Sequence, residues 1–259
     1  MQAAVVQFDT ARKGNRPQSV CLPGVRKFEV TCAGCNLREM CLPEGLSADE
    51  MERMENLVYA RRKVKRGEAL FRAGDRFTSV YAIRVGFFKT ALNHGDGREQ
   101  VTGFQMPGEL LGMEGIGSGE HSSNAVALED CEVCVLPFAT IEEIGREIPA
   151  LQRHLQGVLS REIVRDHGVM MLLGSMRAEE RLAVFLLNLS KRFIRRGWSA
   201  SDFHLRMTRE EIGSYLGLKL ETVSRLFSKF QADGLMEVNQ KHVRIGDIAG
   251  LEKLLGTRS

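Results

Sequence analysis

The chain has 259 residues, which suffices for one large domain or two ordinary ones, and its 43% hydrophobic and 27% charged content is globular. No apolar run near the start is long enough for a signal peptide, and none approaches the ~20 residues of a membrane span. We therefore expect a cytoplasmic protein with no membrane partner, in which cysteine thiols stay reduced.

The net charge of +3 is unevenly distributed along the chain. From residue 177 to the end there are 15 basic and 10 acidic residues, whereas the part before it has 21 basic and 23 acidic residues. Excess positive charge in the last third favours a polyanionic partner, although five charges do not by themselves identify one.

Three of the six cysteines lie within ten residues near the start of the chain. Cys32, Cys35 and Cys41 have the spacing Cys-x2-Cys-x5-Cys. In a reducing compartment such a group is expected to bind a metal or to be a redox centre, rather than to form structural disulfides. A fourth thiolate has two candidates, Cys131 and Cys134. Because these two are three residues apart on a predicted strand, they point to opposite faces, and only one is expected to face the others.

The first 31 residues show no hydrophobic periodicity, so no element is expected there, and no role is assigned to Cys21 within them. Residues 46–57 have the pattern of a short helix. Ser47 is its expected N-cap, and Glu50, three residues later, completes a capping box.

Short strands divided by glycines are expected from residue 64 to residue 137. They lie at residues 79–86, 99–104, 124–128 and 132–136. Along the first of them alternate residues are expected to be buried, namely Tyr81, Ile83 and Val85. Residues 93–97, with two glycines, have the composition of a hairpin turn. Many short strands at this spacing predict a sandwich or a barrel-like roll.

Residues 148–176 form a predicted long helix with two apolar stripes. One stripe consists of Leu151, Leu155, Val158, Val169, Leu172 and Met176. The other consists of Leu159, Ile163, Asp166, Met170 and Leu173, at 4-3-4-3 spacing. A helix packing on its own domain needs one stripe, so the second predicts the coiled-coil seam of a homodimer. The alternative is a helix wholly buried in one subunit, which Asp166 disfavours because an unpaired buried carboxylate is costly.

A domain boundary is expected at residues 176–177, followed by a helix over residues 178–194. Further on, seven positions counted from Arg209 match the pattern of a helix-turn-helix. They are Ile212, Gly213, Leu216, Gly217, Leu218, Val223 and Leu226. The motif needs a small residue where the helices touch, glycine or a similar residue in the turn and apolar residues elsewhere. Thr208 is the expected N-cap of the first helix, with Glu211 three residues on.

The second helix of this motif has four polar residues on its expected solvent face, namely Glu221, Thr222, Ser224 and Arg225. Arginine can bond guanine O6 and N7 together, glutamate can accept from cytosine N4, and serine can contact a base or a phosphate. The alternative is a surface ion pair between Glu221 and Arg225 at i, i+4 spacing. Lys219 is either a phosphate contact or simply solvated.

A glycine-dense roll, a long dimer helix and a helix-turn-helix with Glu221, Ser224 and Arg225 resemble the cyclic-AMP receptor protein superfamily. Within it, the cysteine spacing and four further segments are similar to the fumarate and nitrate reduction regulators. Those segments are residues 81–86, 100–104, 178–182 and 213–218. The resemblance covers nearly the whole chain from about residue 32.

The resemblance implies an α+β protein with an N-terminal antiparallel β-roll of the cupin-like jelly-roll type, a long dimerisation helix and a C-terminal winged helix-turn-helix. Its expected parts are residues 1–45 (cluster-binding segment), 46–147 (roll), 148–176 (dimer helix) and 177–259 (DNA-binding domain). It also implies an activator, not an enzyme, that regulates genes of anaerobic metabolism. Its expected partners are a second copy of the chain, an inverted-repeat operator in double-stranded DNA and RNA polymerase.

A [4Fe–4S] cluster, present when oxygen is absent, is the cofactor that the resemblance implies. Its expected ligands are Cys32, Cys35, Cys41 and Cys134, because the family pattern around residues 133–137 favours Cys134 over Cys131. Thr208 and Arg209, at the start of the first helix of the helix-turn-helix, are also expected to contact DNA.

One departure from the wider superfamily concerns its nucleotide-binding members, which have an Arg-Ser pair for the cyclic phosphate. His121 and Ser122 stand at that place in this chain. Without the guanidinium the phosphate loses a bidentate partner, so control by a cyclic nucleotide is not expected.

Two other interpretations of the cysteines stay open at this point. They could hold zinc, with Cys131 and Cys134 as the second close pair of a four-thiolate site, or bind nothing in a regulator gated by a small molecule. An iron–sulfur enzyme is disfavoured, because the sequence has no substrate-anchoring group, no nucleotide fingerprint and no catalytic His/Asp arrangement.

Overall fold

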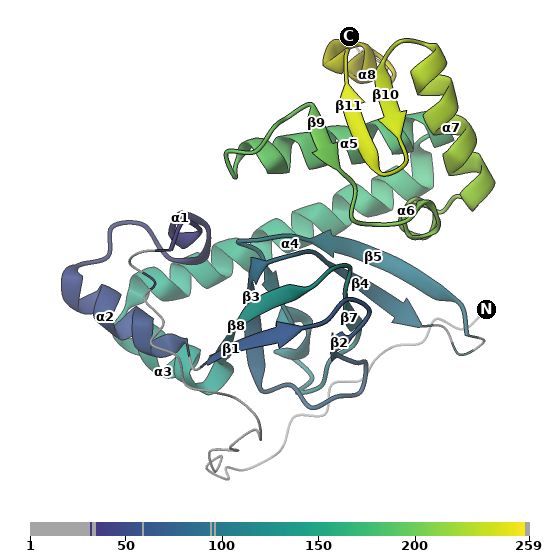
Figure 1. The fold of residues 1–259 in the computed structure, drawn as a ribbon. Coiled ribbons are helices and arrows are strands. Elements are labelled where there is room, and N and C mark those ends of the chain that lie inside the picture. Colours follow the sequence, from purple (N-terminus) through teal and green to yellow (C-terminus); the bar gives the residue numbers. More distant parts are fainter. Residues whose placement is uncertain (1–31, 33–34, 59, 94, 96, 257–259) are drawn as a thin grey trace.

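The computed structural model describes residues 32, 35–58, 60–93, 95 and 97–256 (Figure 1). Its N-terminal half is the predicted antiparallel roll, made of two four-stranded sheets with the orders β1-β8-β3-β6 and β2-β7-β4-β5. The strands are β1 Ala60–Val64, β2 Ala69–Phe71, β3 Ser79–Val85, β4 Phe88–Asn93, β5 Glu99–Gln105, β6 Leu110–Leu111, β7 Asn124–Ala127 and β8 Cys131–Pro137. Strands β4 and β5 pair antiparallel up to Asn93 and Glu99, as the predicted hairpin requires, and residues 94 and 96 of its turn lie outside the described residues.

The interior of the roll is apolar and contains residues from both sheets, among them Phe71, Ile83 and Phe88. The alternation predicted for β3 is wrong. Val80 and Ala82 are buried as well, and Val85 is 51% exposed. The reason is that β3 is covered on both sides over most of its length, since Val80 packs into a separate cluster with the helices outside the roll.

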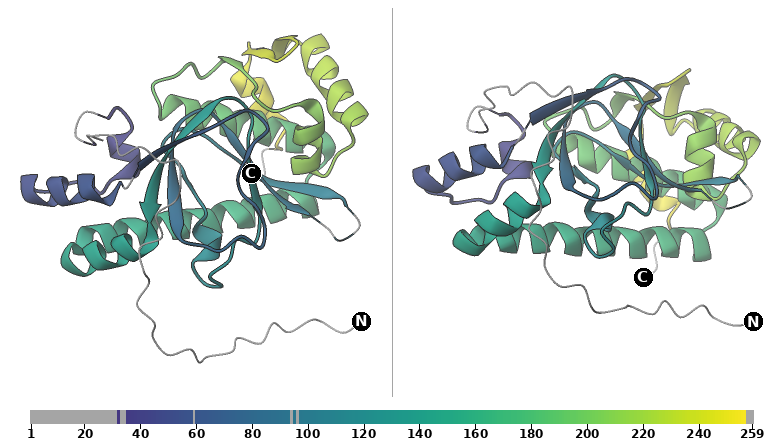
Figure 2. Two further views of the ribbon diagram at one scale, coloured as in Figure 1. Left: turned by 60° about the horizontal axis from the view of Figure 1, so that its bottom comes forward. Right: turned by 90° about the horizontal axis from the view of Figure 1, so that it is seen from below.

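The helices before the C-terminal domain are α1 Arg38–Cys41, α2 Ala48–Leu57, the 3-10 helix Met113–Gly115, α3 Phe138–Glu147 and α4 Pro149–Ser175. The capping box of α2 confirms the predicted roles of Ser47 and Glu50. Helix α4 is the predicted long helix, and it runs along one side of the roll (Figure 2). No helix in the described ranges is long and apolar enough to cross a membrane. Sequence patterns did not predict α1 and α3.

The C-terminal domain contains α5 Ala178–Ile194, β9 Asp202–His204, α6 Arg209–Leu216, α7 Leu220–Ala232, β10 Met236–Asn239, β11 His242–Ile245 and α8 Ile248–Lys253. Helix α5 has the predicted bounds. The three strands form an antiparallel sheet of order β10-β11-β9, whose β10–β11 hairpin is the wing. Helices α6 and α7 confirm the predicted helix-turn-helix.

The roll and the C-terminal domain share one apolar core. Phe87, Val101, Phe104, Met106 and Leu128 of the roll join the cluster that contains the inner faces of α5, α6 and α7. The chain does turn from α4 into α5 at the expected residues 176–177. The DNA-reading part is therefore packed against the roll over a continuous apolar surface.

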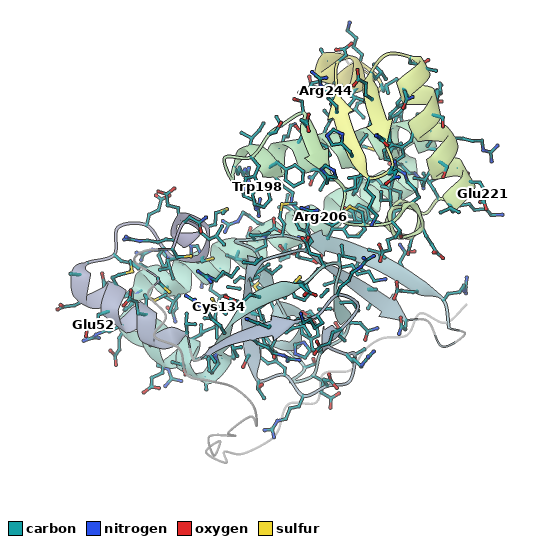
Figure 3. The ribbon with its side chains drawn as sticks, in the orientation of Figure 1. Glu52, Cys134, Trp198, Arg206, Glu221 and Arg244 are labelled. Carbon is teal, nitrogen blue, oxygen red and sulfur yellow. The ribbon has the colours of Figure 1, made fainter. Side chains whose placement is uncertain are left out.

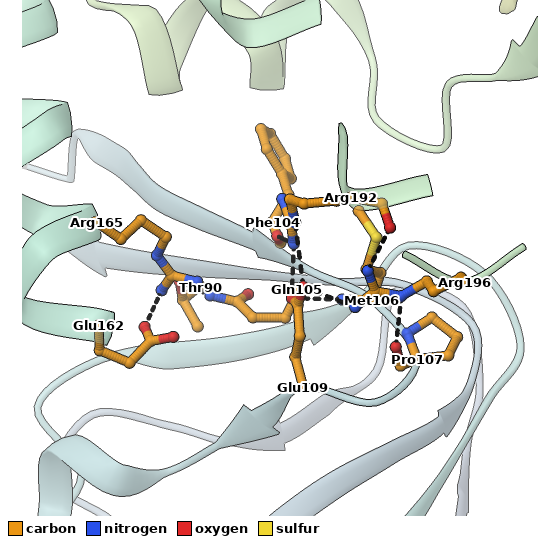
Figure 4. A network of polar contacts seen from close by, with 10 residues as sticks. All are labelled: Thr90, Phe104, Gln105, Met106, Pro107, Glu109, Glu162, Arg165, Arg192 and Arg196. Atoms are coloured by element: carbon orange, nitrogen blue, oxygen red, sulfur yellow. Dashed lines mark hydrogen bonds and ion pairs between the residues drawn. The ribbon is translucent and has the colours of Figure 1, made fainter. Parts of the chain in front are cut away.

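A partly buried ionic network strengthens the same junction (Figure 4). Arg192 of α5 makes a bidentate pair with Glu109, with its Nη2 2.6 Å from Oε2 and its Nε 3.1 Å from Oε1. Arg196 Nη2 donates to Glu109 at 2.8 Å, and its Nε donates to the carbonyl oxygen of Pro107 at 2.6 Å. Burial raises the pKa of Glu109, but the two guanidinium groups outweigh it and hold the pKa below its ordinary value.

Candidate cluster site and DNA-reading surface

Four thiols from two distant parts of the chain lie close enough to influence one another. Burial, followed by Cys134, Cys35 and Cys32 in that order, raises the pKa of Cys41 to about 12. Burial, followed by Cys134 and Cys35, raises the pKa of Cys32 to about 11. The pKa of Cys134 is raised by burial and by Cys35. Every pair among the four is thus in electrostatic contact, as the predicted ligand set requires.

Local backbone structure explains how the sequence gathers three of these thiols. The Cys35 amide donates to the carbonyl oxygen of Cys32 at 3.1 Å, and the Arg38 amide donates to that of Cys35 at 3.1 Å. The Cys41 amide then closes the turn of α1 on Leu37, also at 3.1 Å. Cys134 comes from the middle of β8, where its neighbours across the sheet are Arg61 and Ala82 (Figure 3).

Cys131 points to the other side of β8. It is 4% exposed and lies in the interior of the roll, where its thiol contacts the carbonyl oxygens of Phe87 and Glu129 at 3.3 and 3.2 Å. A Cβ added to Gly86 would lie 2.4 Å from its sulfur, so the backbone approaches closely there. Burial raises the pKa of Cys131 to about 11, and no cysteine is among the groups that influence it. Of the two candidates, only Cys134 faces the other thiols.

The surroundings of the four thiols contain arginines as well as the carboxylates of Glu55 and Glu132. Arg61 and Arg84 lower the pKa of Cys134 against the effect of burial, and Arg196 does the same for Cys41. The Nε of Arg61 is buried without a hydrogen-bond partner, 3.8 Å from the carboxylate of Glu132. Among the residues that the structure describes, no three His, Cys, Asp or Glu side chains are arranged to hold a single metal ion.

The chemistry of this donor set fits an iron–sulfur cluster. Such clusters are commonly held by four thiolates, and a [4Fe–4S] core with four thiolates is an anion. Half-buried thiols, three arginines at their side and a guanidinium nitrogen without a hydrogen bond suit such a group.

The thiol segment and the long helix belong to one apolar cluster. Cys32 and Cys41 contact an apolar cluster that includes Met54 of α2 and Leu151 of α4. Leu155, Val158 and Leu159, further along α4, join the same cluster. The position of the thiol segment is therefore coupled to the N-terminal half of α4 by packing.

Only part of the predicted dimer stripe is exposed to solvent. Ile163 and Met170 are 56% and 65% exposed, and Asp166 between them is exposed as well. At the two ends of the stripe, Leu159 packs into the cluster beside the thiols and Leu173 packs against the core of the DNA-reading domain. Two further apolar residues, missed by sequence reasoning, are exposed beside the stripe: Val164 at 66% and Met171 at 60%. Their seven-residue spacing was the signal that could have revealed them.

The helix-turn-helix has the close contact and the turn that its sequence pattern predicts. A Cβ on Gly213 would lie 2.6 Å from the carbonyl oxygen of Leu218, so any side chain there would push the two helices apart. Gly217 has a φ of +63°, a left-handed conformation that glycine adopts without strain. Thr208 accepts a hydrogen bond from the Glu211 amide at 3.1 Å, which confirms the predicted cap.

The outer face of α7 is available to a ligand. Glu221, Ser224 and Arg225 are exposed, Thr222 is half-buried, and the apolar residues between them are buried (Figure 3). Arg225 Nε donates to the carbonyl oxygen of Glu221 at 3.4 Å, and within the described residues no ion pair joins the two side chains. Lys219, at the N-cap of α7, is exposed.

Arg209 is held inside the domain. Its guanidinium stacks on the ring of Phe227 at 3.3 Å and donates from Nη2 to the carbonyl oxygen of Gln240 at 3.2 Å. Burial lowers the pKa of Arg209 to about 10. It thereby joins α6, α7 and the turn of the wing, a role that its sequence position did not reveal.

His121 is the residue that stands, by the sequence resemblance, where nucleotide-binding members of the superfamily have an arginine. Its ring is buried and stacks on Phe71 with a centroid distance of 3.7 Å and an interplanar angle of 11°. Its Nδ1 lies 3.1 Å from a carboxylate oxygen of Glu114, which also accepts a hydrogen bond from Ser123.

Family models match the roll and the C-terminal domain. A Crp-like helix-turn-helix domain matches residues 180–254, and a cyclic nucleotide-binding domain matches residues 61–147. The chain is 47% identical to the transcriptional regulatory protein btr of Bordetella pertussis, over 88% of this chain and 94% of that protein. It is 46% identical to the transcriptional activator protein FnrA of Stutzerimonas stutzeri, over 87% and 92%.

Two further similarities extend the comparison. The chain is 40% identical to the fumarate and nitrate reduction regulatory protein of Escherichia coli, over 88% of this chain and 91% of that protein. Among solved structures, FixK2 from Bradyrhizobium japonicum superposes with a TM-score of 0.71 and 27% identity, covering 77% of this chain and 98% of that chain.

Proposed function

Since the chain belongs to the FNR- and Anr-type transcriptional regulators of the cyclic-AMP receptor protein superfamily, we propose that it senses oxygen through a [4Fe–4S] cluster. In the absence of oxygen the cluster-bearing protein is a homodimer that binds an inverted-repeat operator and acts with RNA polymerase on genes of anaerobic metabolism. In oxygen it returns to monomers that do not bind the operator.

The observation that carries the proposal is the meeting of four thiols beside α4. Cys32, Cys35, Cys41 and Cys134 would hold the cluster, which supplies iron–sulfide bonds that oxygen attacks. Arg61 and the other nearby guanidinium groups balance the negative charge of the thiolates. Burial keeps the thiols of Cys32 and Cys41 neutral at pH 7 in the metal-free chain, because it raises their pKa values.

The link from the thiols to dimerisation runs through apolar packing. The cluster of side chains around Cys32 and Cys41 includes Leu155 and Leu159 of α4. One turn beyond Leu159 the same helix presents its exposed apolar face, interrupted by Asp166. A shift of the thiol segment is therefore expected to move α4, the helix through which two copies associate.

The side chains that would read the DNA sequence lie on α7. In a dimer the two α7 helices lie about one helical turn of DNA apart, each in a major groove of an inverted repeat. Arg225 and Glu221 would contact base edges, with Ser224 on a base or phosphate and Lys219 on the backbone. The contacts of Arg209 with Phe227 and Gln240 and the capping bonds of Thr208 support a role for both in shaping the domain.

Cyclic nucleotides have no part in the proposal, although the roll matches a cyclic nucleotide-binding domain. The imidazole of His121, stacked on Phe71 and bonded to Glu114, offers no guanidinium to a cyclic phosphate. Calorimetric titration with cyclic AMP is expected to show no binding, and saturable binding at micromolar concentration would contradict this part.

The experiment that tests the cofactor is purification of the full chain without air. The sample is expected to be straw-brown and to contain equal amounts of iron and sulfide, in the proportion of one [4Fe–4S] cluster per chain, and to bleach in air. A colourless sample containing zinc would instead establish a zinc-bound regulator, and a colourless metal-free sample would favour gating by a small molecule.

A further inference from the structure

Helix α6 is bonded directly to the roll. The Ser214 hydroxyl accepts a hydrogen bond from the Val101 amide at 2.8 Å and donates one to the carbonyl oxygen of Glu99 at 3.0 Å. The side chain of Gln100 donates to the carbonyl oxygen of Ser214. Figure 1 shows α6 beside the strand that supplies these groups, β5.

The place of β5 explains why these bonds form. It is an edge strand of its sheet, so every second residue has an amide and a carbonyl group that no neighbouring strand pairs. A serine hydroxyl is both donor and acceptor, and Ser214 therefore substitutes for one residue of a missing strand. We call this contact, made by Ser214 with residues 99–101, the edge latch.

An ion pair reinforces the edge latch. Lys89 of β4 lies with its Nζ 2.7 Å from Glu99 and 3.2 Å from Glu211 of α6, and its side chain is only 13% exposed. The other oxygen of Glu211 accepts the Thr208 amide at 2.7 Å. One carboxylate thus caps α6 and ties it to the roll.

A second anchor holds α6 to the dimer helix. Arg181 of α5 donates to the carbonyl oxygens of Leu173 at 2.8 Å and Met176 at 2.9 Å, at the end of α4, and to that of Leu216 at 3.0 Å. Helix α6 is therefore fixed at two points, by the end of α4 and by the edge of the roll. The reading residues of α7 stay exposed, so the edge latch does not cover the surface that faces DNA.

We propose that Ser214 and Lys89 are positioning residues that set the half-site spacing accepted by the dimer. This inference rests on the proposed binding of a dimer to an inverted repeat. One added base pair moves a half-site by about 3.4 Å and rotates it by about 35°. The edge latch and Arg181 together hold α6 in one position, so the reading domain does not follow that change. Without the edge latch the domain is held by Arg181, the shared apolar core and the network around Glu109, and non-directional apolar packing lets α6 shift enough to accept neighbouring spacings.

The test is selection of duplexes from a random pool by the full chain purified without air. The variants are Ser214→Ala, Lys89→Met and the control Ser118→Ala, whose hydroxyl bonds only Glu120 within the roll. The native chain and the control are expected to select one spacer. The two latch variants should select the same half-site with several spacers, and their preference for the best spacer over its one-base-pair neighbours should fall about tenfold.

Other outcomes separate the possibilities. A single spacer in Ser214→Ala would overturn the inference and leave the proposed function intact. A changed half-site sequence would also overturn it, because Ser214 would then act on the fold of the reading helices. Ser214→Thr, which keeps the hydroxyl, should restore the single spacer. If the native chain selects no inverted repeat, the proposed function fails, and the inference with it.

Discussion

At the scale of single residues, the two cysteines of β8 have opposite environments. Cys134 lies among the other thiols and two arginines, whereas Cys131 is enclosed in the roll. Cys134→Ser is therefore expected to abolish the iron–sulfur absorbance of protein prepared without air, and Cys131→Ser to leave most of it. The two variants are a matched pair on one strand. Loss of the absorbance in Cys131→Ser and its retention in Cys134→Ser would contradict the ligand assignment.

Arg225 is an exposed cation on the reading helix. If it bonds a guanine, Arg225→Ala should weaken operator binding by about 1–3 kcal/mol and relax the preference at one base pair per half-site. Binding by fluorescence anisotropy to duplexes changed at single positions gives both quantities. Equal weakening on every duplex, with no change in preference, would make Arg225 a phosphate contact.

Some residue roles followed from the sequence and some did not. The pattern of Gly213 and Gly217 is local, and it predicted the close helix contact and the turn that the structure shows. The roles of Arg209 and Ser214 depend on Phe227 and β5, which only the tertiary fold brings near. No spacing rule contains that information.

At the scale of elements, α4 joins the thiol segment to the proposed dimer seam. Its exposed stretch includes Ile163, Met170 and the carboxylate of Asp166. Two carboxylates about 5 Å apart repel by about 3 kcal/mol at an effective dielectric constant of about 20. Burial of one large apolar side chain contributes about 1.5–3 kcal/mol, so the two effects are close in size.

Removal of that repulsion should allow the chain to dimerise without the cluster. Asp166→Ala is expected to form dimers and to bind its operator in air, without iron. Sedimentation of the aerobic, iron-free variant at micromolar concentration is the measurement, with the native chain as control. A variant that stays monomeric would show that Asp166 does not oppose association and that the seam lies elsewhere on α4.

The periodicity of the elements explains what could be predicted of them. Helix α4 has apolar stripes over many turns, and α5 is rich in alanine and leucine, so both were found within a residue or two of their ends. Helix α1 has four residues, too few for a periodic pattern. The burial of β3 was mispredicted because the cover on its outer face comes from helices distant in sequence.

At the scale of the whole molecule, the network around Glu109 joins the roll to α5. Glu109→Gln is expected to lower the free energy of unfolding by about 3 kcal/mol, because it leaves Arg192 and the 4%-exposed side chain of Arg196 without their counter-charge. The pKa of Glu109 is held low, so its contribution is present above the unfolded pKa and is lost as pH falls through the folded value. Denaturant unfolding should show a difference from the native chain that is largest near neutrality and shrinks in acid; a difference independent of pH would contradict this account.

The order of parts along the chain was predictable, because each part has its own sequence pattern. These are a cysteine group, short strands divided by glycines, a long helix with apolar stripes and a helix-turn-helix. Their mutual packing was not. The single core shared by the roll and the reading domain arises from Phe87, Phe104 and neighbouring residues on the outside of the roll. From sequence alone, such residues cannot be distinguished from residues of the roll's interior.

The central claim is that oxygen controls both the assembly state and DNA binding through the four thiols. The most direct measurement is sedimentation of one sample, prepared without air and mixed with labelled operator, before and after exposure to oxygen. The account predicts dimers bound to the operator before exposure, and free DNA with monomeric protein once the iron–sulfur absorbance is lost. Dimers that keep the operator after that absorbance has gone would contradict it.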